Sequence, residues 1–285
     1  MSTDVLPAIQ LKKKYAIDAR LVFDTGWRIG SGKEGETMSD LGVVLDAQGA
    51  PLLPGSSIKG KLRSTVESLA HALNLSACML NSAVSGVICS SDVNGFTRKG
   101  ESEDSSLHEQ YRAALQRGPK EQLAWIENHT CAVCKLFGSP LRTARLRCVD
   151  GKLASQEKPV VQVRDGVVLD RDSHQAVDGL KYDYEVVGAG TSFAVRFELE
   201  NPSDEDLVLL GAGLFEWAAG SSLGGFTSRG LGRFTLHDIQ VRWADLSDAQ
   251  HRLAFLTKRS AVEKYPGSGT LESVFGPLIA ARVGG

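Results

Sequence analysis

Apolar residues recur along the chain with two spacings, one typical of strands and the other typical of helices. Residues 15–23 alternate loosely between apolar and polar side chains, and residues 191–199 alternate clearly. Such alternation predicts strands that bury one face. In residues 58–75 and 204–219 the apolar positions instead recur every three or four residues. This spacing predicts two amphipathic helices.

The remaining pattern completes an alternation of strands and helices. Strands are predicted around Arg145 and over residues 234–243, and a helical spacing over residues 107–126 is broken by Gly118-Pro119. The main elements therefore follow the order strand, helix, strand, strand, helix, strand. This order predicts an α+β fold with a ferredoxin-like or RRM-like (βαββαβ) core and insertions between its elements.

The insertions divide the chain into four parts. We expect residues 1–77 to form the first half of the core, residues 78–140 an insertion, residues 141–245 the second half of the core, and residues 246–285 a C-terminal extension. In the second half, two short strand-like runs flank a polar segment, which predicts a long hairpin over about residues 160–187.

Composition sets limits on the class of protein. The 285 residues are 42% hydrophobic and 23% charged, which is typical of a globular chain with enough apolar residues for a core. No apolar run approaches the ~20 residues of a membrane span, and the N-terminus lacks the pattern of a signal peptide. We therefore expect a cytoplasmic protein without a membrane partner. The formal net charge is only -2, so any binding of nucleic acid must come from local basic patches.

One such patch is the segment PGSSIKGKLR at residues 54–63, a tight turn that runs into the first predicted helix. Ser56 or Ser57 can cap this helix, and Lys59, Lys61 and Arg63 follow within its first turns. A helix N-terminus with hydroxyls and cations is suited to bind phosphate. The alternative is an ordinary capped surface helix with solvated charges.

A second patch is the segment LGGFTSRGLGRF at residues 223–234, which places four glycines and two arginines between a helix and a strand. Glycines allow the backbone to approach a partner closely, and Arg229 and Arg233 can bind its phosphates. The segment is not a dinucleotide-binding fingerprint, because its glycines follow a helix instead of opening one after a strand.

The five cysteines of the chain raise the question of a metal site, since an odd number without an export signal argues against a disulfide framework. Cys131 and Cys134 have the spacing at which two thiolates bind one tetrahedral zinc, and Cys78 with Cys89 can complete a four-sulfur structural site. His129 or His108 is a possible substitute ligand, and buried cysteines without metal are the alternative. Cys148 is most simply a core thiol.

The two basic segments, in this order, resemble the RAMP superfamily of CRISPR proteins, whose members carry a PGSSLKGKLR turn early and a GGxxSRGxGR loop late. Within it, the chain is similar to the Cas-seven family, the backbone subunits of type III CRISPR effector complexes. Further matches lie at residues 25–30, 136–139, 163–167 and 182–187. Several type III relatives also carry a zinc knuckle beside the sequence LFG, which stands here at residues 136–138.

The resemblance implies a catalytic aspartate in the loop before the PGSS turn, where relatives have a context like IDNPVIKD. Asp40 takes that place, with a loop one residue shorter and with Gly42 instead of the family's proline. A one-residue shift leaves Glu36 or Asp46 as alternatives. This residue would support cleavage of target RNA with a divalent metal such as magnesium. From the residues alone, a single loop aspartate is ordinary solvated surface.

The resemblance also implies where guide RNA binds. The hairpin would be the family's thumb, which reaches over the guide and kinks it at regular intervals, whereas without the family it is a solvated hairpin. The expected RNA-binding residues are Arg28, Ser56, Ser57, Lys59, Lys61, Arg63, Arg164, Arg229 and Arg233.

Three functions remain open at this point. The first is a guide-RNA-binding backbone subunit that cleaves complementary target RNA, and the second is a scaffold subunit that binds guide RNA without cutting. Their partners would be guide RNA, target RNA, copies of the same chain and other CRISPR subunits. The third is a stand-alone RNA-processing endonuclease that uses histidine chemistry, and His237 is the only histidine placed near the glycine-rich segment.

Overall fold

The structure, a computed structural model, describes residues 10–32, 40–79, 89, 105–155 and 158–284. It has mixed α+β architecture, as expected from the sequence pattern. Glu36 lies outside the described residues, and so does the side chain of His108. None of the helices in the described ranges combines the length and the hydropathy needed to cross a membrane.

A central antiparallel sheet organises the part of the chain that the structure describes. Its seven strands follow the order β2-β6-β1-β8-β7, with β3 paired to β6 and β9 paired to β8. The strands are β1 (Lys13–Phe23), β2 (Leu146–Cys148), β3 (Lys152–Leu153), β6 (Ser192–Glu200), β7 (Ser221–Ser222), β8 (Arg233–Asp245) and β9 (Gly267–Gly269). The strands predicted from alternation at residues 15–23, 191–199 and 234–243 are therefore confirmed.

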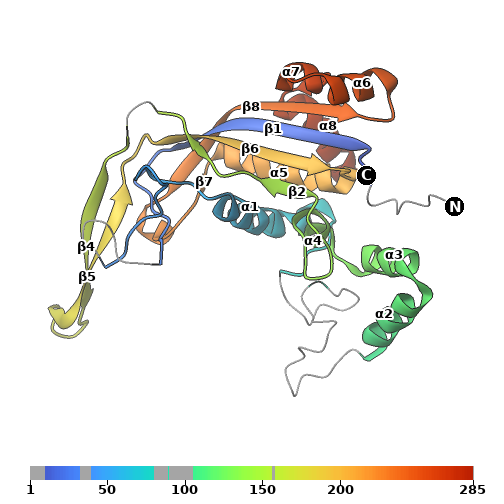
Figure 1. Ribbon diagram of the computed structural model, residues 1–285. Helices are drawn as coiled ribbons and strands as arrows, with labels where there is room; N and C mark the ends of the chain where they lie inside the picture. The colour runs from blue at the N-terminus through green and yellow to red at the C-terminus, as the bar shows by residue number, and fades with distance from the viewer. Residues whose placement is uncertain (1–9, 33–39, 80–88, 90–104, 156–157, 285) are drawn as a thin grey trace.

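Helices cover the apolar face of this sheet. Figure 1 shows α5 (Asp204–Ala219) and α1 (Gly55–Ala70) along one side of β6 and β1. The two helices are joined by a hydrogen bond from Trp217 Nε1 to Thr65 Oγ1 of 3.0 Å. A third helix, α8 (Leu271–Val283), packs on α5 where Gly211 leaves room for the ring of Phe275. This face of the sheet therefore carries the main hydrophobic core.

The opposite side of the sheet is covered only in part. The short helices α6 (Ala249–Thr257) and α7 (Ala261–Lys264) lie there, and Tyr265 packs with Ala16 and Ala244 in a small second cluster. Elsewhere on this face the strands carry paired charges, such as Asp18 between Arg196 and Arg242.

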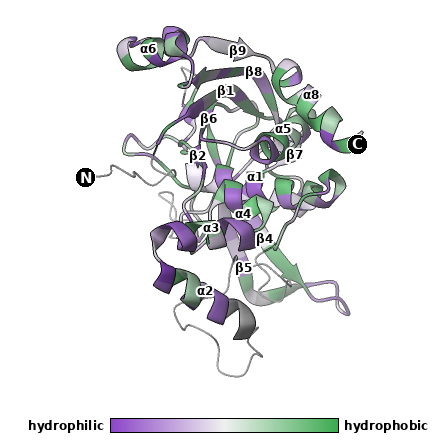
Figure 2. Cartoon of the chain, turned by 90° about the vertical axis from the view of Figure 1, so that its right-hand side faces the viewer, coloured by the Kyte–Doolittle hydropathy of each residue, from purple (hydrophilic) through white to green (hydrophobic). Residues whose placement is uncertain are grey.

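A two-stranded hairpin extends away from the body of the molecule. Its strands are β4 (Val161–Leu169) and β5 (Ala176–Val187), which among the described residues form a two-stranded sheet of their own. Figure 1 shows them projecting from one end. Apolar side chains on both strands are exposed. In the cartoon of Figure 2, green marks hydrophobic residues along the hairpin, beside a polar tip. The predicted hairpin is thus confirmed.

The predicted insertion contains three helices within its described residues. These are α2 (Ser105–Arg117), α3 (Pro119–His129) and α4 (Ala132–Phe137). The break at Gly118-Pro119 separates α2 from α3, as the sequence predicts, because proline is favoured in the first turn of a helix. Glu127 of α3 contacts both Arg142 and Arg145, which attaches α3 to the segment that leads into β2.

Two expectations for the first helix are wrong. The helix begins at Gly55 instead of residue 58 and ends as an α-helix at Ala70, with a 3₁₀ turn at His71–Leu73. Neither Ser56 nor Ser57 caps it, because Pro54 occupies the N-cap position and both serines lie within the first turn. The main elements otherwise occur as β1, α1, β2, β6, α5 and β8 in chain order.

Candidate nucleic-acid interface and cysteine cluster

The glycine-rich loop lies directly on the chain that follows β1. Gly225 N donates to Arg28 O at 2.9 Å, and Gly232 N donates to Gly26 O at 2.8 Å. Gly224 has a φ of +101°, and a Cβ placed on it would overlap the carbonyl of Arg28. Only glycine combines this backbone angle with such a close approach. The glycines therefore hold the loop against residues 26–28.

Phe226, in the middle of this loop, positions the arginine that follows it. The residue has a φ of +60°, which is unusual for a residue with a side chain. The centre of its ring lies 5.1 Å from the guanidinium carbon of Arg28 and 4.9 Å from that of Arg229. Its edge contacts Tyr184 of the hairpin, with ring centroids 4.8 Å apart. Sequence reasoning missed this residue, which carries no charge.

Arg229 is exposed and held by the hairpin. Its Nη1 donates to the hydroxyl of Tyr182 at 2.7 Å, and this hydrogen bond is the main cause that raises the pKa of Arg229 above its usual value. The remaining donors of an arginine are free to fork onto a phosphate. Arg164, on the neighbouring strand β4, and Arg233, at the start of β8, are also exposed.

Arg28 has a different environment from the other predicted cations. Only 6% of it is exposed, and burial lowers the pKa of its guanidinium. Its Nε donates to Glu185 O and its Nη2 to Leu41 O, both at 3.2 Å. The guanidinium therefore serves backbone groups of the protein itself.

Asp40 lies beside the base of the hairpin. Its Oδ2 accepts a hydrogen bond from Asp183 N at 2.9 Å, and the next residue, Leu41, exchanges backbone hydrogen bonds with Asp183 and Glu185. The Glu185 carboxylate in turn accepts from Val43 N at 2.9 Å. The loop that begins at Asp40 therefore runs along β5. Asp40 itself is exposed.

Two further carboxylates lie close to this loop. Asp165 and Asp183 face each other across the hairpin, one on each strand. A hydrogen bond with Asp165 is the largest cause that raises the pKa of Asp183, and the charges of Asp165 and Asp40 add to it. Such mutual repulsion is what a bound cation relieves. The alternation of the hairpin could have placed Asp165 and Asp183 on one face, but not beside Asp40.

The alternative aspartate has a local role. Asp46 Oδ1 accepts hydrogen bonds from Gln48 N and Ala50 N, at 2.9 and 2.8 Å. This is the usual way in which an aspartate closes a turn on its own backbone. Both bonds therefore tie Asp46 to its own turn.

The start of α1 meets the connection between β2 and β3. Asp150 Oδ1 accepts from Gly55 N at 2.7 Å, so a carboxylate already caps one amide of the helix N-terminus. A Cβ on Gly55 would lie 2.6 Å from Cys148 O, which explains the glycine. Ser56 is exposed, and Ser57, Lys59 and Lys61 are half-buried. Burial is the main cause that lowers the pKa of Lys59.

Arg63 points to the cysteines instead. Its Nη2 donates to Cys134 Sγ at 3.1 Å, its Nη1 to Gly138 O at 3.3 Å, and its Nε to Glu67 at 2.9 Å. From the sequence, Arg63 is expected to bind RNA in the same way as the two lysines of α1. Among the described residues, the Arg63 guanidinium instead contacts groups of the protein itself, unlike Lys59 and Lys61.

The four cysteines at positions 78, 89, 131 and 134 form one buried cluster. Their sulfur atoms all lie within 4.8 Å of one another. Cys131 caps α4 by accepting from Cys134 N at 3.4 Å, and Cys89 accepts from Cys131 N at 3.2 Å. Hydrogen bonds from Cys134 and Cys89 lower the pKa of Cys131, which favours a thiolate. Four converging sulfurs could hold a metal ion, and they leave no coordination position for water.

His129, one of the two possible substitute ligands, makes other contacts. The ring of His129 stacks on Trp125 with centroids 4.1 Å apart, and its Nδ1 contacts Trp125 O at 2.8 Å. Cys148, the fifth cysteine, lies outside the cluster in β2, where burial raises the pKa of its thiol to about 12.

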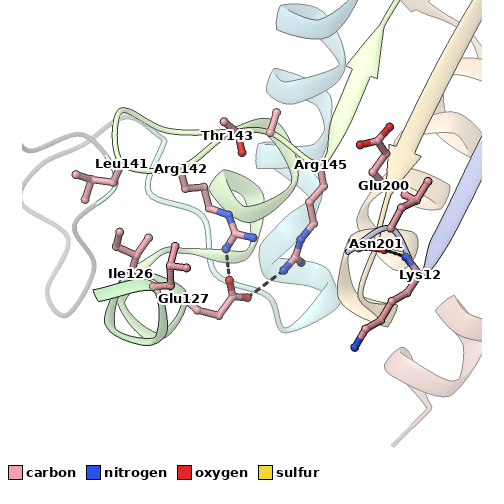
Figure 3. Close-up of a pocket in the computed structure, with 12 residues that line it drawn as sticks. Lys12, Ile126, Glu127, Leu141, Arg142, Thr143, Arg145, Glu200 and Asn201 are labelled. Carbon is pink, nitrogen blue, oxygen red and sulfur yellow. Dashed lines mark hydrogen bonds and ion pairs between the residues drawn. The ribbon is translucent and has the colours of Figure 1, made fainter. Parts of the chain in front are cut away.

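A cleft of about 610 Å³ lies between α3 and the edge of the sheet. Figure 3 shows Glu127 inside it, contacting Arg142 and Arg145. Burial would raise the pKa of Glu127, but the two arginines lower it below its usual value. Because Arg145 also pairs with the buried Asp206, these cations are neutralised within the protein and do not form a phosphate site.

Comparison with known proteins places this fold and this loop in a family. The family model of the RAMP superfamily matches residues 20–235, from β1 to the start of β8. The chain belongs to the RAMP superfamily, and the resemblance seen in its sequence is confirmed. It is similar to the CRISPR system Cms endoribonuclease Csm3 of Methanocaldococcus jannaschii, with 25% identity over 249 residues that cover 82% of each chain.

Proposed function

We propose that this protein is a guide-RNA-binding backbone subunit of a type III CRISPR effector complex, and that it cleaves complementary target RNA. The observation that carries the proposal is that Arg229 and Asp40 are hydrogen-bonded to two adjacent residues of the hairpin strand β5. Tyr182 holds Arg229, and Asp183 holds Asp40. A cation for the RNA backbone and a carboxylate for its cleavage thus lie at the same end of the hairpin.

The architecture supports this proposal. The four main strands lie in the order β2-β6-β1-β8, which is 2-3-1-4 in their chain order. We infer that they form a ferredoxin-like core with two covering helices, α1 and α5. In this reading residues 1–77 and 141–245 are the two halves of the core, and residues 78–140 and 246–285 are the insertion and the extension.

Guide RNA would be held through its phosphates. The exposed Arg164, Arg229 and Arg233 lie on the hairpin and the glycine-rich loop, and they supply the charge. Ser56, Ser57, Lys59 and Lys61 at the start of α1 would extend this surface. Contacts of this kind position a strand without reading its bases, so base pairing with the guide would select the target.

Cleavage would take place at the Asp40 loop. Asp40, Asp165 and Asp183 offer the carboxylate oxygens that a divalent cation such as magnesium prefers. Bound there, the cation would supply electrostatic stabilisation for the in-line attack of a ribose 2′-OH on the adjacent phosphate. Asp40 would help hold it, and the hydrogen bond from Asp183 N would fix the orientation of the Asp40 carboxylate.

A non-cutting scaffold is the second candidate, and two observations favour it. Gly42 stands where the family's loop has a proline, and one oxygen of Asp40 is already occupied by Asp183 N. The scaffold would use the same RNA surface. The two candidates therefore differ only in the chemistry of the Asp40 loop.

We further propose that the cysteine cluster holds a structural zinc ion. The support is the donor set itself, four converging buried sulfurs that zinc binds in tetrahedral sites. The bound ion would fasten α4 to the segment around Cys78 and, through Arg63, to α1.

The test of the proposed function is reconstitution. The chain is expressed with its neighbouring complex subunits and a guide, and the purified complex is incubated with complementary RNA, with magnesium or with a chelator. We expect RNA to co-purify and cleavage to require magnesium, with evenly spaced fragments if several copies line one guide. A complex that binds complementary RNA but never cuts it would leave the scaffold function in place of the nuclease.

A further inference from the structure

We propose that Arg28 is a positioning residue that locks the Asp40 loop, the hairpin and the glycine-rich loop into one arrangement, so that RNA held by Arg229 is in register with Asp40. The inference rests on the proposed function. It assigns Arg28 to the interior of the site, whereas the sequence motif had placed it among the RNA contacts.

The hydrogen bonds of Arg28 join three segments that are far apart in the chain. Its carbonyl accepts from Gly225 of the glycine-rich loop at 2.9 Å. Its side chain donates to Leu41 O, next to Asp40, and to Glu185 O in the hairpin, both at 3.2 Å. These are contacts with backbone groups, so they depend on the path of each segment and not on its side chains.

The guanidinium also fixes the aromatic residues between the two loops. Its carbon lies 5.1 Å from the centre of the Phe226 ring and 5.8 Å from that of Tyr184. Arg229 lies 4.9 Å from the same Phe226 ring. Arg28 and Arg229 thus both make a cation–π contact with the ring of Phe226. A displacement of Arg28 would free this ring, and Phe226 would then no longer hold Arg229 in place.

Burial explains why a cation at this place acts on the protein and not on RNA. Arg28 is 6% exposed, and Glu185, whose backbone it contacts, is 2% exposed. The carboxylate of Glu185 is bonded to Val43 N, two residues after Leu41. The Arg28 guanidinium and the Glu185 carboxylate, both buried, therefore each bond a backbone group of the same short loop, at Leu41 and at Val43.

Lysine cannot replace this arrangement. Its single ammonium group lacks the planar fork that reaches two carbonyls at once, and it does not stack on a ring as a guanidinium does. The backbone on either side has independent support, because Trp27 and Val187 exchange two hydrogen bonds of 3.0 and 2.8 Å. An Arg28→Lys chain is therefore expected to fold with a loosened loop.

The experiment compares Arg28→Lys and Arg28→Gln with Arg164→Gln in the assembled complex. Arg164 is the matched control, since it is an exposed cation on the same hairpin. We expect both Arg28 variants to keep RNA affinity close to that of the unaltered complex, to cut roughly ten- to a hundredfold more slowly, and to cut at neighbouring positions as well. Arg164→Gln should show the reverse, with weaker binding and unchanged cut positions.

Hydrogen exchange on the isolated chain provides a readout that does not depend on cleavage. In both Arg28 variants the amides of residues 41–44 and 183–187 should exchange faster, while those of β1 and β6 keep their protection and report an intact core. Unchanged exchange at residues 41–44 overturns the proposal. So does a loss of RNA affinity that matches Arg164→Gln, because it would show a direct RNA contact.

The two proposals fail in different ways. If the unaltered complex never cuts RNA, the nuclease function falls, and the exchange measurement alone decides whether Arg28 locks the loops. If the unaltered complex cuts and Arg28→Lys cuts at the same rate and positions, only the positioning role falls.

Discussion

Single residues at the hairpin base have roles that their chemical type does not reveal. Arg28 and Arg229 are both arginines beside the ring of Phe226, yet one is buried on backbone carbonyls and the other is exposed. The difference follows from position, because Arg28 lies where the Asp40 loop, the hairpin and the glycine-rich loop meet. A buried guanidinium serves the fold, and an exposed one can serve a ligand.

Asp40 is the residue at which the nuclease and scaffold proposals separate. Asp40→Ala should leave complex assembly and target pairing intact and abolish metal-dependent cleavage, because binding rests on cations elsewhere. Asp40→Asn is the sharper variant, since its amide oxygen can still accept from Asp183 N while the negative charge is lost. Cleavage products are measured on denaturing gels with guide and target held constant.

Matched controls come from the same loop region. Asp46→Ala removes an aspartate that closes its own turn, and Glu36→Ala removes the other alternative. We expect both to cut. If cleavage survives all of these changes, no carboxylate of this loop takes part in it, and the proposed role of Asp40 is wrong.

Asp183 should make cation binding depend on pH. The pKa of Asp183 is raised, chiefly by its hydrogen bond with Asp165, so this carboxyl keeps its proton at a higher pH than an ordinary aspartate. Protons and cations compete for it, and cation affinity should therefore fall as the pH is lowered through that pKa. A manganese titration of the isolated chain at several pH values measures the effect. In Asp183→Asn the dependence should weaken, and an identical pH profile would exclude this role.

At the scale of elements, the short helix α4 packs against α1 and α5. All its residues except Lys135 are buried, and Cys131 at its N-cap belongs to the sulfur cluster. Six residues are too few for a stable isolated helix. Its stability must come from packing and from the proposed zinc ion.

Loss of a cysteine ligand should therefore affect folding before function. We expect about one zinc per chain by elemental analysis, and a lower melting temperature for Cys131→Ser and Cys134→Ser. Cys148→Ser is the matched control, because that cysteine lies outside the cluster and should leave the zinc content unchanged. A well-folded chain that contains no metal after purification without chelator would contradict the zinc proposal.

The hairpin is the other element whose role depends on its surroundings. Within the part of the chain that the structure describes, no further strand pairs with its two strands over most of their length, and exposed valines and leucines lie on both. Exposed apolar area of this kind marks a surface for partners. Its base, in contrast, is fastened to the Asp40 loop by backbone hydrogen bonds.

For the whole molecule, the distribution of charged residues matters more for RNA binding than the net charge does. The net charge of -2 does not favour RNA, and many cations are paired with carboxylates, as Arg145 and Arg242 are. The exposed arginines of the glycine-rich loop and the hairpin are local exceptions. Binding of RNA should then depend on few residues.

Arg229→Ala together with Arg233→Ala should weaken binding about equally for different guide sequences and should flatten its salt dependence, with a slope smaller by roughly one per lost phosphate contact. Tyr182→Phe is the matched control, because it removes the hydrogen bond to Arg229 and keeps the charge. It should weaken binding less. A loss confined to certain guide sequences would contradict the phosphate role.

Local patterns in the sequence were enough to determine the elements and the family. Alternation and helical spacing depend on neighbouring residues, so β1, β6, α5 and the hairpin could be predicted. The spacing of Cys131 and Cys134 indicated a metal site, and Cys78 and Cys89 do join them in one cluster. The motifs at residues 54–63 and 223–234 indicated the superfamily that the comparison confirms.

Only the tertiary structure decided which arginines contact the protein and which are exposed for a ligand. Arg28, Arg63 and Arg229 have one side-chain chemistry, but they contact Glu185, Cys134 and Tyr182, which lie 157, 71 and 47 positions away in the chain. No local pattern specifies contacts over such distances. The predicted start of α1 is wrong for the same reason. Asp150, which accepts from Gly55 N, lies between β2 and β3 and is 95 positions away in the chain. Long-range packing sets burial, and burial decides whether a charge faces the protein or a ligand.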